Sequence, residues 1–143
     1  LFDIVPDDLN SYERKVALVL DRDERVLWWY RNLVGAHNFA IQGYRRNRIY
    51  PDFIVQKGKK KTPSQNVVVI ESKGTQLSGN PDTQYKKNIA KYFTQAGKVV
   101  KWQQLGSGFA DRVFRFQVVD EGEYPGEGWR EELRKILEET GTL

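Results

Sequence analysis

The chain contains no cysteine and no methionine, and His37 is the single histidine among its 143 residues. These absences exclude a Cys or His zinc site, an iron–sulfur cluster and a cysteine nucleophile, so any bound metal must be held by oxygen atoms. No stretch approaches the roughly 18 apolar residues of a membrane-spanning helix, and the first residues lack the pattern of a signal peptide. We therefore expect a cytoplasmic protein with no membrane partner.

The length of the chain is sufficient for one domain with a substantial core and too short for two ordinary domains. Hydrophobic residues make up 39% of the sequence and charged residues 29%, which is typical of a globular protein. We therefore expect residues 1–143 to form a single domain. Because position 1 is not methionine, we also expect this domain to be a piece of a longer polypeptide.

The basic residues are unevenly distributed. The net charge is only +4, but lysine and arginine gather in three segments, 45–48, 57–61 and 86–91. Such clustering favours a polyanionic partner, although a solvated surface would show the same pattern.

Apolar spacing predicts three helices. The first covers 10–21. The second begins after Asn80 as its N-terminal cap, has proline at its first position and ends at Gly97. The third covers 128–140.

Runs of β-branched and aromatic residues predict the strands, the first two of which we expect to form a hairpin. One continuous apolar run, 67–72, is typical of a strand covered by helices on both faces. The predicted strands cover 26–30, 39–45, 49–56, 67–72, 99–104 and 113–119. Together with the helices they predict an α/β fold with a central mixed β-sheet flanked by helices.

Acidic and basic residues follow one another at the ends of two predicted strands. Asp52 lies in the strand over 49–56, and Glu71, Ser72 and Lys73 end the strand over 67–72. Residues at i and i+2 of a strand share a face, so Glu71 and Lys73 emerge together, and Asp52 joins them if the two strands are neighbours. Two carboxylates in a chain without Cys or His ligands suit Mg²⁺, which takes carboxylates together with water and substrate phosphate.

This set of residues matches the needs of phosphodiester hydrolysis. The attacking water must lose a proton near neutral pH while negative charge builds on the phosphate, and a divalent ion serves both needs. Asp52 and Glu71 would hold the ion, and the backbone carbonyl of Ser72 could add a third oxygen. Lys73 would orient the water or stabilise the transition state.

The pattern of Pro51-Asp52, eighteen further residues and then Glu71-Ser72-Lys73 resembles the PD-(D/E)xK nuclease superfamily. That resemblance implies a restriction-endonuclease-like fold. The segments 28–32, 43–53 and 71–74 are further similar to the C-terminal nuclease domain attached to type III restriction enzyme subunits and related DEAD/DEAH-box helicase proteins. The similarity covers about 11–93, and nothing specific is recognised beyond it.

The resemblance implies a Mg²⁺-dependent endonuclease acting on DNA, in which Mn²⁺ substitutes for Mg²⁺. It also implies that the chain is the C-terminal fragment of a helicase–nuclease, whose helicase/ATPase region is a partner. No GxxxxGK[ST] motif is present, so we expect no ATP site in this fragment. Superfamily members often use an acid of the first helix, which corresponds to Glu13. Glu13 can equally form a capping box with Asn10.

Simpler interpretations exist for each candidate residue. Asp52, Glu71 and Lys73 could form a solvated salt bridge at a strand end. The candidate nucleic-acid contacts are Arg46, Arg48 and Lys86, and the two arginines alternate onto the face of Asp52. All three could instead be solvent-exposed charges.

Two other functions remain open beside the nuclease. One is a catalytically silent nuclease-like module that binds DNA, against which the complete set of Asp52, Glu71 and Lys73 argues. The other is a purely structural accessory domain, which would show no salt-sensitive affinity for DNA.

Overall fold

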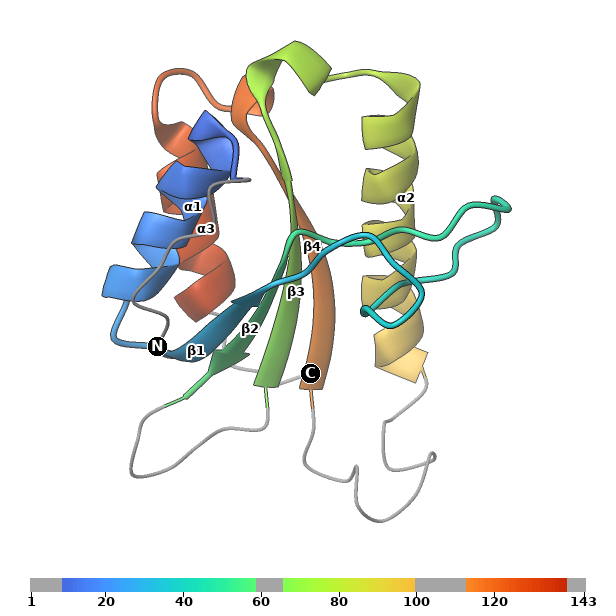
Figure 1. Ribbon diagram of the computed structural model, residues 1–143, viewed down its shortest axis with the longest axis horizontal. Coiled ribbons are helices and arrows are strands. Elements are labelled where there is room, and N and C mark those ends of the chain that lie inside the picture. The colour runs from blue at the N-terminus through green and yellow to red at the C-terminus, as the bar shows by residue number, and fades with distance from the viewer. Residues whose placement is uncertain (1–8, 59–65, 100–112, 139–143) are drawn as a thin grey trace.

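The computed structural model describes residues 9–58, 66–99 and 113–138. These residues form three helices, four strands and two short 3-10 turns, arranged as a sheet between helices (Figure 1). In chain order the elements are α1 (Ser11–Arg22), β1 (Val26–Arg31), β2 (Phe53–Lys57), β3 (Asn66–Lys73), η1 (Thr75–Leu77), α2 (Pro81–Val99), β4 (Val113–Asp120), η4 (Glu121–Glu123) and α3 (Gly128–Glu138).

The four strands form one mixed sheet in the order β1-β2-β3-β4. β1 pairs with β2 and β2 with β3 in antiparallel fashion, whereas β3 and β4 are parallel and are joined through α2. Helices α1 and α3 cover one face of the sheet and α2 covers the other (Figure 1). The predicted α/β class, with a mixed sheet flanked by helices, is confirmed.

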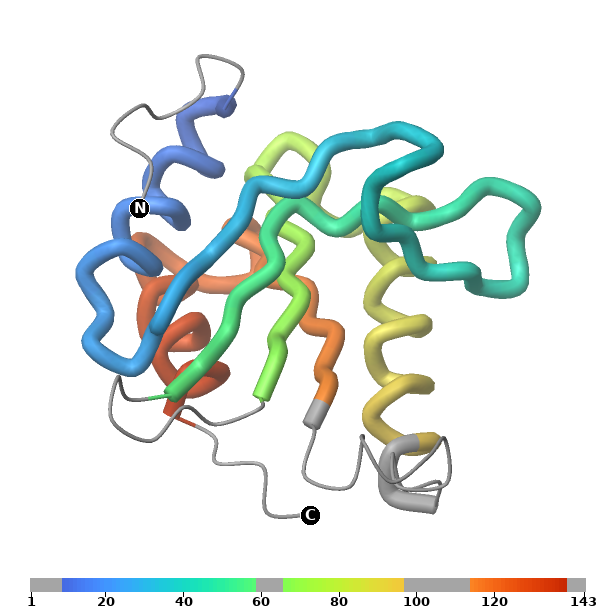
Figure 2. Tube along the Cα trace, turned by 60° about the horizontal axis from the view of Figure 1, so that its bottom comes forward, coloured from blue at the N-terminus to red at the C-terminus, as the bar shows by residue number. Residues whose placement is uncertain are grey.

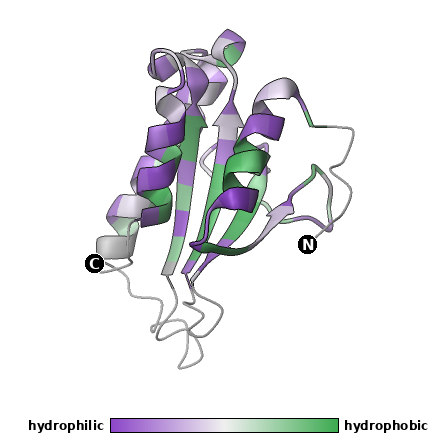
Figure 3. Ribbon diagram, turned by 90° about the vertical axis from the view of Figure 1, so that its left-hand side faces the viewer, coloured by the Kyte–Doolittle hydropathy of each residue, from purple (hydrophilic) through white to green (hydrophobic). Residues whose placement is uncertain are grey.

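Two hydrophobic clusters hold the layers together, one on each face. Phe53 and Ile70 belong to the cluster under α1 and α3, and Val69 belongs to the cluster under α2. Because neighbouring residues of a strand point to opposite faces, the unbroken apolar run in β3 supplies both cores. The helices turn their hydrophobic sides toward the strands (Figure 3).

The predicted strand over 39–45 and its hairpin with 26–30 are wrong. Residues 32–52 form a long loop whose one described bridge joins Ile41 to Ile49, and β1 pairs instead with β2. Ile41 and Ile49 of this segment are buried because they belong to the cluster under α2, not because they pair in the sheet. Both ribbon and tube views show this loop crossing to the side of α2 (Figures 1 and 2).

The strand predicted over 49–56 begins only at Phe53, two residues after Pro51. Proline cannot donate a hydrogen bond to a sheet and is therefore disfavoured inside a paired strand.

Of the two predicted ends of α2, the N-terminal one is confirmed and the C-terminal one is wrong. Asn80 caps the helix as predicted, since its Oδ1 accepts a 2.7 Å hydrogen bond from the amide of Thr83. Gly97 does not end the helix, which continues to Val99, because one glycine costs only about 1 kcal/mol in a helix interior. The predicted strand over 99–104 therefore begins inside α2, and the rest of it lies outside the described residues. Within the described parts of the chain, no helix is long and apolar enough to cross a membrane.

Candidate functional site

The candidate residues meet at the end of the sheet where β3 finishes and β2 starts. Phe53 pairs with Ile70, so Asp52, immediately before β2, lies opposite Glu71. Glu71 and Lys73 share the face of the sheet that α2 covers, as alternation along the strand requires. The structure pairs Lys73 with Glu71 and places Asp52 near enough for the two carboxylates to repel each other, although Asp52 precedes β2 instead of lying within the predicted strand.

Glu71 is the most deeply buried acid of this group, with 2% of its surface exposed. Its Oε1 atom lies 2.7 Å from the Nζ of Lys73 and 2.7 Å from the Nζ of Lys86 on α2. Its Oε2 atom is also buried but has no hydrogen-bond partner among the described residues. One oxygen of this carboxylate is therefore fully used, and the other retains its capacity to bind a donor or a cation.

The charge of Glu71 is poorly accommodated by its surroundings. Burial raises the pKa of this carboxyl group and repulsion from Asp52 raises it further, while Lys86 and Lys73 oppose the shift without cancelling it. For Lys86, burial acts to lower the pKa, but attraction to Glu71 and Asp82 outweighs it and the net shift is upward. Lys86 is therefore stabilised in its charged form, whereas the nearby lysines do not fully offset the cost of burying the charge of Glu71.

Asp52 has a different set of partners. Its Oδ2 accepts hydrogen bonds from the amide and the hydroxyl of Ser72, at 2.8 and 2.7 Å. Its Oδ1 accepts from the Nη1 of Arg31 at 3.0 Å, and the Nη2 of the same arginine lies 3.2 Å from Oε1 of Glu13. Arg31 therefore links the candidate acid of α1 to the candidate metal ligand before β2.

Glu13 forms the capping box that the sequence allows. Its amide donates to Asn10 Oδ1 at 2.9 Å, and its Oε2 accepts from the amide of Asn10 at 3.1 Å. The structural role is therefore confirmed. The contact with Arg31 adds a route by which Glu13 bears on Asp52, so the two roles proposed for this residue are compatible.

The Ser72 carbonyl is oriented suitably for the role expected of it. Although β3 continues to pair with β4 as far as Lys73, the Ser72 amide points away from β4, toward Asp52. In an antiparallel ladder the amide and carbonyl of one residue face the same neighbouring strand. The Ser72 carbonyl therefore faces the β2 side, beyond the last pair, which joins Phe53 to Ile70.

The oxygen atoms at this strand end suit a hard divalent cation. No group of three or more His, Cys, Asp or Glu side chains is arranged to hold a metal in the described parts of the chain. Mg²⁺ does not need one, because it is commonly held by one or two carboxylates with water and phosphate completing the shell. Asp52, Glu71 and the Ser72 carbonyl form such a partial set, and the unpartnered Oε2 of Glu71 is the atom with most to gain from an ion.

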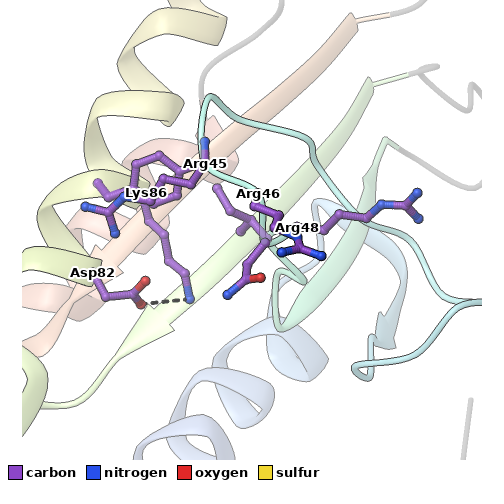
Figure 4. A pocket seen from close by; sticks show the side chains of 8 residues that line it. Arg45, Arg46, Arg48, Asp82 and Lys86 are labelled. Atoms are coloured by element: carbon purple, nitrogen blue, oxygen red, sulfur yellow. Dashed lines mark hydrogen bonds and ion pairs between the residues drawn. The ribbon is translucent and has the colours of Figure 1, made fainter.

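A cationic pocket lies next to this strand end, between the loop over 45–49 and α2 (Figure 4). It has a volume of about 370 Å³ and carries four basic side chains against one acidic one. Its lining consists of Arg45, Arg46, Asn47, Arg48, Ile49, Asp82, Tyr85 and Lys86. The three predicted nucleic-acid contacts are thus gathered in one place, but the arginines arrive there from a loop and not by alternation along a strand.

Two lysines of α2 are largely buried. The side chains of Lys86 and Lys87 are only 16% and 20% exposed. Lys87 Nζ lies 2.7 Å from Oδ2 of Asp120, which is fully buried. Their long side chains reach over the end of the sheet to Glu71 of β3 and Asp120 of β4. Helical periodicity alone does not predict these contacts.

Arg31 was missed as a site residue. It lies in a segment that carries the family resemblance, but no spacing rule connects it with Asp52. Trp29 and Arg31 alternate onto one face of β1, and Trp29 packs against Phe53 on that face. That alternation is the signal from which the position of Arg31 could have been derived.

No family model matches the chain, and neither does any curated protein or solved structure.

Proposed function

We propose that this chain is a metal-dependent nuclease domain that hydrolyses phosphodiester bonds of DNA. The observation that carries the proposal is the buried Glu71 carboxylate, with one oxygen unpartnered, beside Asp52 and in contact with a lysine of the cationic pocket. A buried carboxylate whose pKa is shifted by burial and by neighbouring charges, next to a charged pocket, is characteristic of functional sites.

The architecture supports this proposal. A helix, three antiparallel strands, a second helix and a strand parallel to the third follow one another in the chain. This order agrees with the restriction-endonuclease-like fold, which we propose for the domain together with membership of the PD-(D/E)xK superfamily. By the same resemblance we propose that the domain serves as the nuclease part of a longer helicase chain.

We assign metal binding to the acidic residues and positioning of the attacking water to a lysine. Asp52, Glu71 and the carbonyl of Ser72 would hold Mg²⁺ or Mn²⁺, and Lys73 would position the attacking water beside Glu71. The bound ion would supply acidity to that water and stabilise charge on the phosphate. Arg31 fixes the orientation of Asp52 and joins it to Glu13.

The DNA contacts come from the cationic pocket. Arg46 and Arg48 would bind backbone phosphates in it. Lys86 would bind phosphate while staying next to Glu71, which places the cleaved bond close to the metal ligands.

Nicking of supercoiled plasmid DNA tests the chemistry. We expect cleavage with Mg²⁺ or Mn²⁺, none with EDTA, and loss of cleavage in Asp52→Ala and Lys73→Ala. The matched control is Lys91→Ala, which removes an exposed lysine of α2. Cleavage by Asp52→Ala or Lys73→Ala at the rate of the unmodified chain would refute the assignment.

Calorimetric titration with Mn²⁺ tests the same site without requiring turnover. We expect the unmodified chain and Lys91→Ala to bind Mn²⁺ and Glu71→Gln to lose binding. This measurement matters because the parent chain could be needed to deliver DNA, whereas ion uptake depends on the strand end alone. Failure of the unmodified chain to bind Mn²⁺ would contradict a catalytic role.

One observation favours a catalytically silent DNA-binding module as the second candidate. Asp52 already interacts with Arg31, and Glu71 with Lys73 and Lys86, so basic side chains already contact both acids without an ion. Such a module would bind DNA through the cationic pocket but would take up no Mn²⁺. The calorimetric titration therefore separates the two functions.

A further inference from the structure

Beside the cationic pocket lies a tyrosine whose exposure nothing in the fold explains. Tyr44 is 74% exposed, although large aromatic side chains are usually buried at least in part. It is nevertheless held in place, because its ring meets the ring of Tyr85 edge to face, with centroids 4.9 Å apart and planes at 80°. The residue therefore presents an open aromatic surface in a defined position.

The same buried tyrosine ties Tyr44 to the cationic pocket. The hydroxyl of Tyr85 accepts a hydrogen bond from the amide of Arg45, and the Arg45 guanidinium stacks over the Tyr85 ring at 4.2 Å. Gly43 permits this close approach, since a Cβ at that position would overlap the hydroxyl of Tyr85. The loop is thus fastened to α2 at the point where the exposed aromatic ring and the arginines meet.

We propose that the DNA enters this site as a single strand, with an unpaired base stacked on Tyr44 and the adjoining phosphates in the cationic pocket. The proposal rests on the proposed function in one respect, namely that the polyanion is DNA. Charged grooves that carry exposed aromatic rings are the usual means of binding single strands, because every unpaired base has an open face for stacking.

Duplex DNA would gain nothing from the exposed ring of Tyr44. Its bases are stacked on one another and offer no face to Tyr44, so only the basic residues would contribute to binding. The pocket has a volume of about 370 Å³, which is enough for a phosphate and its sugar. Lys86, which lines the pocket and contacts Glu71, connects the bound phosphate with the candidate metal ligands.

Fluorescence anisotropy with labelled DNA tests this proposal, with EDTA present so that no cleavage occurs. The probes are a short oligothymidylate, a duplex of equal length and an abasic strand that keeps the phosphates but lacks bases. We expect the unmodified chain to bind the oligothymidylate more tightly than either other probe. Tyr44→Ala should weaken binding of the oligothymidylate about 5- to 150-fold and leave the other two affinities within about twofold.

Two further variants serve as controls. Tyr44→Phe keeps the aromatic ring and should retain the affinity for the oligothymidylate, and Arg48→Ala should weaken all three probes because they share phosphates. A melting curve of Tyr44→Ala establishes that the variant is folded.

The proposal is overturned if Tyr44→Ala weakens all probes equally or none, or if the unmodified chain prefers the duplex. Because these affinities are measured without metal, they hold or fail independently of whether the chain cleaves DNA.

Discussion

Glu71 and Asp120 lie near the same end of two neighbouring strands but differ in how their carboxylate oxygens are hydrogen-bonded. Each lies on the α2 face near the end of one of the two parallel strands, and each is paired with one of two consecutive lysines of α2 at 2.7 Å. Both oxygens of Asp120 have hydrogen-bond partners, because Oδ1 accepts from the Gly122 amide and Oδ2 from Ser78 and Lys87. Glu71 leaves one buried oxygen without any partner among the described residues.

The difference separates a structural acid from one with unused binding capacity. A buried carboxylate with all its hydrogen bonds made stabilises the connection between strand and helix. A buried carboxylate with an unpartnered oxygen weakens the fold by itself and gains from a cation. The same helix therefore satisfies the acid at the end of β4 but leaves one oxygen of the acid in β3 without a partner among the described residues.

The largest expected difference between the two acids is in the free energy of unfolding. We expect Asp120→Ala to lower the free energy of unfolding by about 2–4 kcal/mol, because Lys87, Ser78 and Gly122 lose a buried acceptor. Glu71→Gln should change it by less than about 1 kcal/mol, since Asp82 is a second partner for Lys86 at 3.2 Å. Urea denaturation measures both values, and equal losses for the two variants would remove the distinction between the acids.

A smaller effect distinguishes the two lysines. Lys86→Ala should weaken DNA binding in EDTA and reduce the slope of log affinity against log salt by about one, because one phosphate contact is lost. Lys87→Ala should leave both quantities unchanged but cost about 1–2 kcal/mol of stability, because Asp120 is left buried without its lysine. An equal effect of the two substitutions on the salt slope would show that the lysines are interchangeable.

The smallest effect is a pH dependence. The pKa of Glu71 in the folded chain lies above its ordinary value of 4.5, so the folded state holds this proton more tightly than the unfolded state. Stability contributed by the group is therefore greatest at low pH and falls as the pH rises through the interval between the two pKa values. Denaturation of the unmodified chain and of Glu71→Gln across this interval isolates the contribution. The unmodified chain should lose stability relative to Glu71→Gln as the pH rises through this interval, and a relative gain would contradict the assigned direction.

The elements that were predicted correctly are those with a strong local signal. The apolar run of β3 and the capping residues Asn10 and Asn80 depend on neighbours close in the sequence, and each of them was recognised. The prediction of a strand over 39–45 was wrong because Ile41 is buried against α2, an element that begins far later in the chain at Pro81. Propensity does not distinguish an apolar residue that packs under a helix from one that pairs in a sheet.

The same limit applied to the site. The local order of residues was enough to bring Glu71, Ser72 and Lys73 to one strand end, because a strand alternates with a period of two whatever surrounds it. Which side chains neutralise these acids, and which oxygen is left over, depended on the packing of α2 and of the loop over 45–49 against the sheet. Long basic side chains such as Arg31 and Lys86 reach several ångströms from their backbone. Their partners therefore depend on which distant segments the tertiary structure places nearby.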